Sequence, residues 1–297
     1  MESKKQIYDL LPRQYYPNTI LVHNGTAFGE IVREIERKKF HYPLVGKPDI
    51  GLKGLSVKKL NNQEELFEYA SQSKVNFLVQ EFISYDNEVG IFYYRFPNEH
   101  RGHISGIVKK EFLTVEGDGK STITELLRKD KRHILQLSAL KKSHGNDLRG
   151  ILQKGQRSVL VPYGNHVRGA KFIDASDLID EELTNTIDRI CRGVKGFYFG
   201  RLDIRFNSWE ELKKGKYISI IELNGAGSEP THIYDPKHSI FFAWKEIIRH
   251  WNILCKISRI NHCHHQLPYM NISSGLEMFR QNKAYVKMIS EDIKQTA

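Results

Sequence analysis

The chain has 297 residues, enough for one large domain or two modest ones, and its 40% hydrophobic and 27% charged residues are typical of a globular protein. Three scattered cysteines are too few for a disulfide framework and fit a reducing, cytoplasmic environment. No signal peptide pattern opens the chain, and no segment approaches the roughly 18 apolar residues of a membrane helix, so no membrane partner is expected.

The formal net charge of +10 allows two interpretations. A basic protein can bind nucleic acid, or it can bind anionic small molecules such as nucleotides. The lysines and arginines are spread along the chain without a sustained run, and no nucleic-acid-binding motif is present. We therefore expect no nucleic-acid partner. Binding that ignores ATP and weakens steeply with salt would favour the opposite interpretation.

Short strands alternate with a helix in the first part of the chain. Apolar runs predict strands at 42–47, 77–82, 89–96 and 102–112, with a helix at 63–71. Thr122 and Glu125 have capping-box spacing, so a helix begins there. The preceding Gly119 to Ser121 resembles the end of a P-loop, but Thr114 occupies the place of its first glycine. A turn leading into a capped helix is the better interpretation.

The second part of the chain ends in helices. Residues 130–154 contain helical stretches, 180–194 form an amphipathic helix, and 197–206 and 217–223 alternate as strands. From Ser239 onward the pattern is helical, with Phe241, Trp244, Ile247 and Ile248 as the expected buried stripe. Residues 270–297 are expected to form a helical tail. This mixture of helices and mostly antiparallel strands predicts an α+β fold.

The two strands at 197–206 and 217–223 carry the most informative polar residues. Side chains alternate along a strand, so Arg201 and Asp203 share one face, as do Glu222 and Asn224. If the strands form a hairpin, Asp203 falls close to Glu222. Magnesium prefers oxygen ligands and Arg201 can hold anionic oxygens, so a metal–phosphate site is one interpretation. A solvated sheet face is the other, although the glycines that follow Asn224 favour the site.

Lys47 stands at a strand end before a loop that contains Gly51, Gly54 and Ser56. Glycines let a backbone curl over phosphates while a lysine supplies a point charge. A lysine before a surface turn has the same pattern, and that interpretation is the commoner one.

Two glutamates lie on either side of a connection between strands. Glu81 ends one strand, and Glu88 opens the next. The backbone of the connection can hydrogen-bond an adenine, and a carboxylate can accept from ribose hydroxyls. Taken singly, each glutamate is better interpreted as a solvent-facing strand end.

In this order, the lysine, the glycine loop, the two glutamates and the acidic hairpin resemble the ATP-grasp superfamily. The resemblance is strongest to D-alanine–D-alanine ligase and to the ATP-grasp part of cyanophycin synthetase, and it covers roughly residues 4–235. It implies an α+β fold in which two subdomains grip ATP between antiparallel sheets. It also implies an ATP-dependent carbon–nitrogen ligase acting through an acyl phosphate.

The resemblance assigns expected roles to residues of this chain. Nucleotide-contacting residues would be Lys4 (or Lys5), Lys47, Gly51, Gly54, Ser56, Glu81, Phe82, Ile83, Ser84 and Glu88. Ligands of two Mg²⁺ ions, with Mn²⁺ as an alternative, would be Asp203, Glu222 and Asn224. Catalytic residues would be Arg201, which steadies the acyl phosphate, with Arg168 and Lys171 facing the phosphates.

The same resemblance divides the chain. Residues 1–40 would be a remnant of an N-terminal region, 41–100 the small subdomain, 101–238 the large subdomain with the metal site, and 239–297 a C-terminal helical segment. Relatives carry a whole domain before the nucleotide-binding region, and here only about forty residues precede Lys47. The expected partners are a small-molecule carboxylate and an amine, such as amino acids or peptides, and a homo-oligomer is compatible with the sequence.

Two alternatives remain open. The chain can be an ATP-binding module without ligase turnover that acts with a partner. Separately, the segment from His262 to His265 contains three histidines and Cys263, which invites a zinc interpretation. Structural zinc sites usually draw ligands from two clusters, and the sequence shows no second one, so a surface helix end or loop is favoured.

Overall fold

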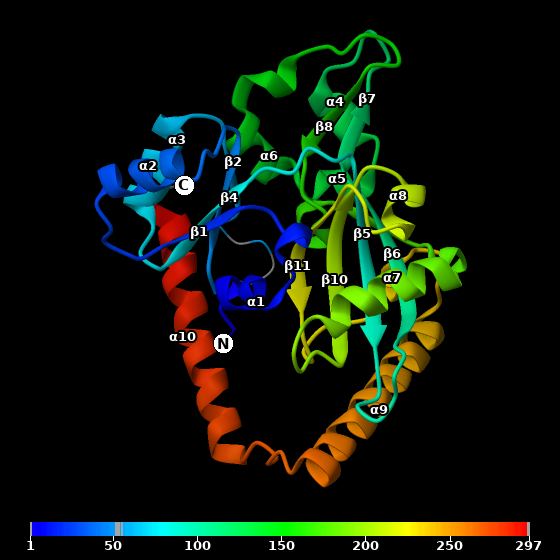
Figure 1. The fold of residues 1–297 in the computed structure, drawn as a ribbon. Helices are drawn as coiled ribbons and strands as arrows, with labels where there is room; N and C mark the ends of the chain where they lie inside the picture. The colour runs from blue at the N-terminus through cyan, green and yellow to red at the C-terminus, as the bar shows by residue number, and fades with distance from the viewer. Residues whose placement is uncertain (1, 51–53, 55, 296–297) are drawn as a thin grey trace.

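Two antiparallel sheets form the framework of the protein, the smaller at the left and the larger at the right of Figure 1. The computed structural model describes residues 2–50, 54 and 56–295. The smaller sheet has the order β1 (Thr19–Val22), β4 (Phe77–Glu81), β2 (Leu44–Pro48), β3 (Lys58–Leu60). The larger has the order β11 (Ile218–Asn224), β10 (Phe199–Phe206), β5 (Asn87–Tyr94), β6 (His103–Glu111), β9 (Lys171–Asp174). The predicted α+β class is confirmed.

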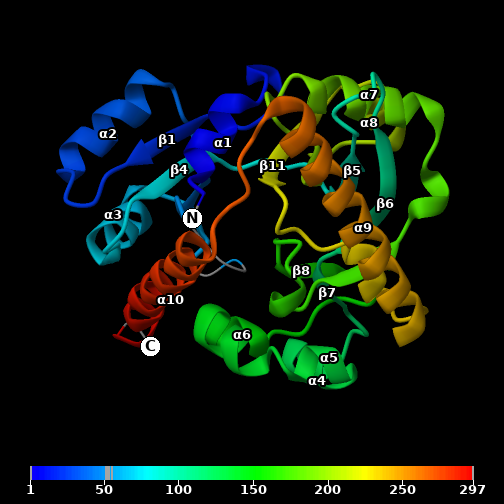
Figure 2. The same cartoon turned by 90° about the horizontal axis from the view of Figure 1, so that it is seen from below.

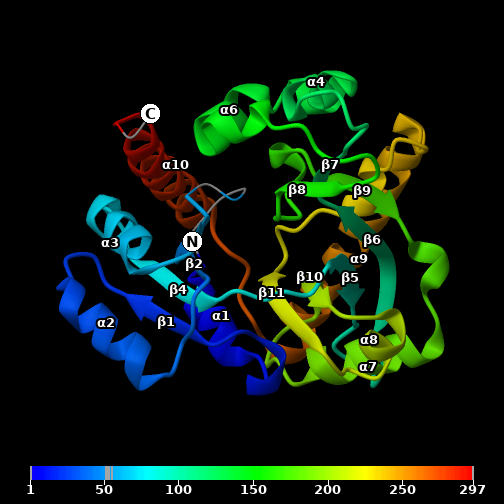
Figure 3. The same ribbon diagram turned by 90° about the horizontal axis from the view of Figure 1, so that it is seen from above.

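Helices flank these sheets along the whole chain. The α-helices are α1 (Lys4–Leu10), α2 (Phe28–Arg37), α3 (Gln63–Gln72), α4 (Ile123–Arg128), α5 (Lys131–Ile134), α6 (Leu137–His144), α7 (Glu181–Arg192), α8 (Trp209–Lys213), α9 (Ile240–His265) and α10 (Ile272–Gln295). Short 3₁₀ turns are η1 (Arg13–Tyr15), η2 (Gly145–Arg149), η3 (His166–Arg168), η4 (Ser176–Leu178) and η5 (Thr231–Tyr234). A separate pair, β7 (Leu113–Glu116) and β8 (Arg157–Val161), packs with α4 and α6, which lie together in Figure 3.

Alternation of side chains gives the smaller sheet two different faces. Leu44 of β2 and Phe77 and Val79 of β4 pack against α2 and α3 in one apolar cluster. Lys47 and Gln80 point to the opposite face because they alternate with these residues along the strands. This opposite face is turned toward α1 and β11, so the polar residues of β2 and β4 meet the larger sheet.

The larger sheet also has one apolar and one polar face. Leu202, Ile204 and Phe206 of β10 pack with Ile187 and other residues of α7 in the largest apolar cluster. On the other face β10 presents Phe199, Arg201, Asp203 and Arg205, which are the intervening residues. At one end of that face Phe199 packs with Phe92 and with Ile253 and Ile257 of α9. The charged residues are left at the other end.

Helix α1 connects the two sheets at the N-terminus. The backbone N–H of Lys4 donates to the carbonyl of Asp49, just after β2, at 3.0 Å. One turn later the Tyr8 hydroxyl donates to the carbonyl of Ile221 in β11. The two sheets are therefore joined by hydrogen bonds from a single short helix, which lies between them in Figure 1.

The prediction of which face of α9 is buried is wrong. Phe241, Trp244 and Ile248 are exposed, and Ile247 is only partly buried. The face that packs on the sheet consists instead of Glu246, His250, Ile253 and Ile257. Its two polar residues can be buried because His250 hydrogen-bonds Ser105 at 2.9 Å and Glu246 lies 3.4 Å from His232.

The last helix returns to the smaller sheet. In Figures 1 and 2, α9 crosses the outside of the larger sheet and α10 runs back toward the N-terminal half. There the Tyr285 side chain is hydrogen-bonded to the backbone of Ile50, just after β2. Within the described residues, no helix is long and apolar enough to cross a membrane. The domain boundaries given from the sequence stay predictions.

Two smaller expectations concern the turns. The capping box at Thr122 and Glu125 is present, and α4 begins at Ile123 as predicted. At the end of α9, His262 hydrogen-bonds the carbonyl of Leu267 at 2.9 Å, and its ring stacks on Tyr269. The histidine-rich segment thus ends a helix, as the favoured interpretation expected.

Candidate active site

The acidic hairpin has the predicted register. Strands β10 and β11 are antiparallel neighbours, with Asp203 opposite Glu222 and Arg201 opposite Asn224. The register shifts by one residue directly beyond Asp203, a β-bulge that bends the strand next to the carboxylates. The sequence therefore brings two carboxylates, one amide and one guanidinium to one end of the polar face.

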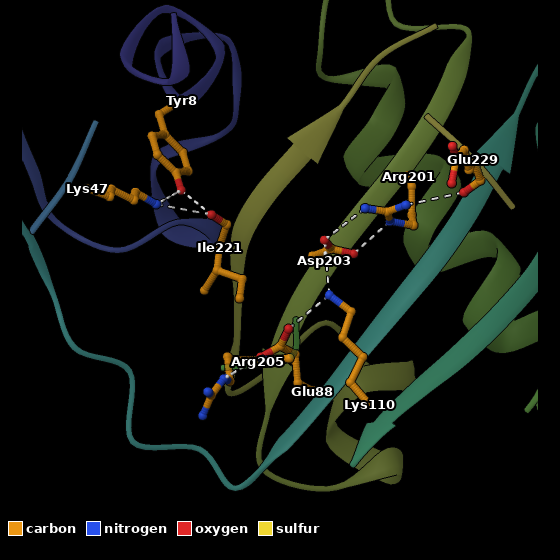
Figure 4. A network of polar contacts seen from close by, with 10 residues as sticks. Tyr8, Lys47, Glu88, Lys110, Arg201, Asp203, Arg205, Ile221 and Glu229 are labelled. Carbon is orange, nitrogen blue, oxygen red and sulfur yellow. Dashed lines mark hydrogen bonds and ion pairs between the residues drawn. The ribbon is translucent and has the colours of Figure 1, made fainter. Parts of the chain in front are cut away.

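Asp203 is held by two cations of the same sheet face (Figure 4). Arg201 Nε lies 2.9 Å from one carboxylate oxygen, and Lys110 Nζ lies 3.1 Å from the other. Burial alone would raise the pKa of Asp203, but Arg201 and Lys110 outweigh it and keep this pKa below its ordinary value. Gly90 provides the room, since a Cβ there would lie 2.8 Å from Val108 and 3.1 Å from Asp203.

Glu88 continues this network into the sheet. Its carboxylate is 3% exposed and accepts from Lys110 Nζ at 2.9 Å and from Arg205 Nε at 3.0 Å. The interpretation of Glu88 as a solvent-facing strand end is wrong. A contact with ribose, which the resemblance implies, would require Glu88 to be uncovered.

Lys110 and Arg205 were not expected as site residues. Arg205 follows Asp203 at the spacing of two that keeps it on the same face, so its signal was present in the sequence. Lys110 had no such signal, because Lys109 beside it is an equally plausible inward residue until the pairing of β6 is known.

Lys47 faces this network from the smaller sheet. Its ammonium donates to the Tyr8 hydroxyl at 2.8 Å and to the carbonyl of Ile221 at 3.3 Å (Figure 4). It also donates to Gln80 Oε1 at 2.9 Å. Burial lowers the pKa of Lys47 to about 8, and the charges of Glu222 and Asp49 offset this only in part.

Lys4 joins Lys47 at the junction of the sheets. Burial lowers the pKa of Lys4, while Glu222 acts to raise it and Lys47 to lower it further. Its neighbour Lys5 forms an ion pair with Asp9 on the exposed side of α1. Of the two lysines considered from the sequence, Lys4 is therefore the one placed beside Glu222 and Lys47.

Asn224 and Glu222 complete the oxygen-donor set. Among the described residues, no hydrogen bond engages the buried Asn224 Nδ2 atom. The amide group can be turned either way, so it can offer an oxygen or a nitrogen to a ligand. The described residues contain no group of three His, Cys, Asp or Glu able to hold a metal. Two carboxylates and an amide still suit Mg²⁺, which keeps waters and phosphate oxygens as further ligands.

The glycine loop meets the segment that holds Arg168. Gly51 lies outside the described residues, whereas Gly54 has φ +74° and a Cβ there would lie 2.5 Å from Asn165 Nδ2. Arg168 Nη1 donates to the carbonyl of Val57 at 3.2 Å, one residue after Ser56. The structure therefore brings the loop after β2 and η3 together.

Lys171 is not brought into this cluster. It is exposed on β9, and the next residue, Phe172, lies opposite Lys110 with its ring near the Lys110 ammonium. Because neighbouring residues of a strand point to opposite faces, Lys171 points away from Asp203 and Glu222.

The connection between β4 and β5, which the resemblance implies for adenine binding, is an irregular segment. Glu81 ends β4 and accepts from the backbone N–H of Asn18 at 3.1 Å, and Lys59 lies over the ring of Phe82. Ile83 and Ser84 follow without regular structure, so their backbone groups are not used by a strand ladder. These positions stay predictions for adenine binding.

The comparisons with known proteins give similar folds only. No protein-family model matches the sequence, and no curated protein matches it. Similar solved structures include a bifunctional glutathione synthetase from Pasteurella multocida (17% identity, TM-score 0.44, covering 86% of this chain and 35% of that one). VanG D-Ala:D-Ser ligase from Enterococcus faecalis is similar at 14% identity and a TM-score of 0.48, covering 87% of this chain and 61% of that one. D-alanine–D-alanine ligase from Bacillus anthracis is similar at 14% identity and a TM-score of 0.45, covering 86% of this chain and 65% of that one.

D-alanine–D-alanine ligase, which the ordered motifs resemble, is thus among the structures similar to this chain. The predicted resemblance is confirmed to that extent. This chain spans between about a third and two thirds of the length of these three proteins. No role of an individual residue is transferred from them, because the identities are 17% or less and the TM-scores lie below 0.5.

Proposed function

We propose that this chain is an ATP-dependent ligase that joins a small-molecule carboxylate to an amine through an acyl phosphate, releasing ADP and phosphate. The observation that supports it most is the meeting of two charged surfaces where the sheets join. The larger sheet contributes oxygen donors and a guanidinium, the smaller sheet contributes a buried lysine, and α1 contributes a partly buried one. These residues are Asp203, Glu222, Asn224, Arg201, Lys47 and Lys4.

The two lysines would bind the phosphates of ATP. A carboxylate that attacks ATP approaches a polyanion, so the reaction needs cations placed around the transferred phosphoryl group. Lys47 donates to neutral oxygens only, and burial opposes its charge, so an anionic ligand would stabilise it strongly. Gly54 and Ser56 would let the adjoining loop close over the phosphates and exclude water.

The carboxylate side of the site would hold Mg²⁺ through Asp203, Glu222 and Asn224. When bound, the ions neutralise developing negative charge on the phosphoryl oxygens. Arg201 lies beside these donors and also donates to the carbonyl of Glu229 at 3.2 Å. From there it would steady the acyl phosphate and the oxyanion that forms when the amine attacks.

The test is calorimetry with ATP, with and without magnesium, followed by phosphate release against a panel of amino acids and dipeptides. Magnesium-dependent binding together with release for one acid–amine pair is the expected result. Glu222→Gln should abolish release while the protein stays folded, and the exposed Glu210→Gln serves as a matched control. Wild-type rates in Glu222→Gln would contradict the metal assignment, and no binding of ATP would contradict the proposed function.

A second candidate is an ATP-binding module that acts with a partner and has no turnover alone. One observation favours it: both carboxylate oxygens of Asp203 already contact the cations Arg201 and Lys110. In this case ATP binds, but no acid–amine pair releases phosphate.

A further inference from the structure

Helix α9 has a second apolar stripe that faces away from the protein. Phe241, Trp244, Ile248, Trp251 and Cys255 recur at steps of three and four residues, so they form one line along the helix. At 3.6 residues per turn, this line lies roughly opposite the packed residues from Glu246 to Ile257. The stripe is therefore the outermost surface of α9.

The side chains of this outer stripe are strongly exposed. Phe241 and Trp251 are each 72% exposed, and Trp244 and Ile248 are more than half exposed. The rings of Phe241 and Trp244 pack edge to face, with their centroids 5.8 Å apart. Two of the three tryptophans of the chain thus lie on one exposed line of a single helix. Contiguous exposed apolar surface of this kind marks an interaction site.

The charges beside the stripe are all positive. Lys245, Lys256 and Arg259 are exposed on α9, and Arg249 is also exposed while it contacts Glu246. Glu246 is the one acidic residue in the sequence of α9, and it is buried. The whole chain carries a formal charge of +10. A partner for this surface must therefore be negatively charged as well as apolar.

These features disfavour other occupants. A second copy of the chain would place one basic helix against another, without an exposed acidic residue on α9 to pair with. A protein groove can take one apolar face of a helix, but to match this surface it would also have to be acidic. An anionic membrane offers an apolar and a negatively charged layer over a flat area, which fits a stripe on one face of a helix that is packed on its other face.

We propose that α9 binds the surface of an anionic membrane, with its aromatic stripe in the headgroup region and its lysines and arginines next to the phosphates. Tryptophan and phenylalanine on one face with basic residues beside them are the features of helices that lie in this region. The expectation of no membrane partner rests on the lack of a spanning segment, whereas a helix in the headgroup region needs one apolar face only.

The test uses the full chain and vesicles of phosphatidylcholine, with or without phosphatidylserine. Sedimentation should recover the protein with the mixed vesicles and leave it in solution with phosphatidylcholine alone. The emission of Trp244 and Trp251 should shift to shorter wavelength on binding. Raised ionic strength should weaken binding, because the attraction is partly between exposed charges.

Paired variants separate the contribution of the basic residues from that of the aromatic stripe. Lys245→Glu with Lys256→Glu should reduce binding at least about tenfold, since each basic residue near an anionic surface increases affinity about fivefold. Lys214→Glu with Lys216→Glu changes the net charge equally on the exposed turn after α8 and should bind nearly as the wild type. Trp244→Ala with Trp251→Ala should also lose binding, whereas the exposed Leu135→Ala should not.

Three outcomes would overturn this assignment. Equal binding to both kinds of vesicle would remove the role of charge. A failure to bind either kind would leave α9 without a membrane role. A dimer in solution that dissociates in the Trp244 and Trp251 variant would show that the stripe binds a second copy. None of these outcomes depends on ATP binding, so they are independent of the proposed ligase activity.

Discussion

Two buried lysines, one on each sheet, differ in their partners. Lys47 and Lys110 are both 7% exposed. Lys47 donates to a hydroxyl, an amide oxygen and a carbonyl, whereas Lys110 contacts the carboxylates of Glu88 and Asp203. Burial lowers the pKa of Lys47 to about 8; for Lys110, burial acts in the same direction, but Asp203 and Glu88 outweigh it and raise the pKa.

The comparison shows that burial alone does not decide what a lysine does. The charge of Lys110 is neutralised inside the sheet, so its role is to hold two carboxylates in place. The hydrogen-bond partners of Lys47 are neutral, and Glu222 and Asp49 offset its burial only in part, so its charge can still neutralise an anionic ligand. The two lysines should therefore respond in opposite ways to mutation and to pH.

The largest effect is expected for Lys110→Met. The variant leaves Glu88 and Asp203 buried with one cation fewer, and breaking a buried ion pair costs about 3–5 kcal/mol. Urea denaturation should show this loss in the free energy of unfolding. Lys109→Met, at the exposed neighbouring position, is the control. A loss no larger than that of the control would mean that the network does not stabilise the sheet.

Lys47 and Lys110 should contribute to the pH dependence of the free energy of unfolding with opposite signs. The pKa of Lys47 is about 8 in the folded protein, against an ordinary value of 10.5, so the unfolded chain binds more protons between these values. The wild type should gain about 3 kcal/mol relative to Lys47→Met as pH rises through this window. Relative to Lys110→Met, it should instead lose stability as pH rises past 10.5. The measurement is the free energy of unfolding at several pH values for the wild type and both variants. If the wild type changed with pH in the same way relative to Lys47→Met and to Lys110→Met, the comparison would be contradicted.

Lys47→Met should act mainly on ligand binding. Losing a charge-assisted hydrogen bond costs about 1.5–3 kcal/mol, which is about a tenfold to hundredfold weaker affinity for ATP. Calorimetry measures this change, with the exposed Lys58→Met on β3 as control. An unchanged affinity would exclude the proposed phosphate contact.

Tyr8→Phe should have the smallest effect. It removes a hydroxyl that accepts from the Lys47 ammonium and donates to the carbonyl of Ile221. Lys47 still donates directly to that carbonyl, so the expected net loss is about 1 kcal/mol. Thermal unfolding should show a small decrease in Tm, because the Lys47 ammonium loses one hydrogen-bond partner. A loss as large as that of Lys110→Met would mean that the Tyr8 contact is as important as an ion pair.

The hairpin could be predicted because it depends on local rules. Strand alternation and the pairing of two strands that are consecutive in the chain are enough to place Asp203 near Glu222. The network around Glu88 could not, because it requires the register of β5, β6 and β10 together. Lys109 and Lys110 have the same side chain, and only the pairing of β6 decides that Lys110 points inward.

Helix α9 shows a different limit of sequence patterns. It has apolar residues on two opposite faces, and the sequence pattern favours the more apolar one as the buried face. The packed face contains Glu246 and His250, which are tolerated because His232 and Ser105 contact their polar atoms. Such partners, from β6 and η5, are distant in sequence and leave no periodic signal.

Helix α10 is a long rod that connects the end of α9 with the residues just after β2. Its 24 residues correspond to a rod of about 36 Å, hinged at one end on the turn after α9 and touching Ile50 through Tyr285. Tyr285 lies about 20 Å along this rod, where a tilt of about 5° about the hinge corresponds to a displacement of about 2 Å. A rotation of α9 that tilted α10 would therefore reach the residues just after β2, the strand that carries Lys47.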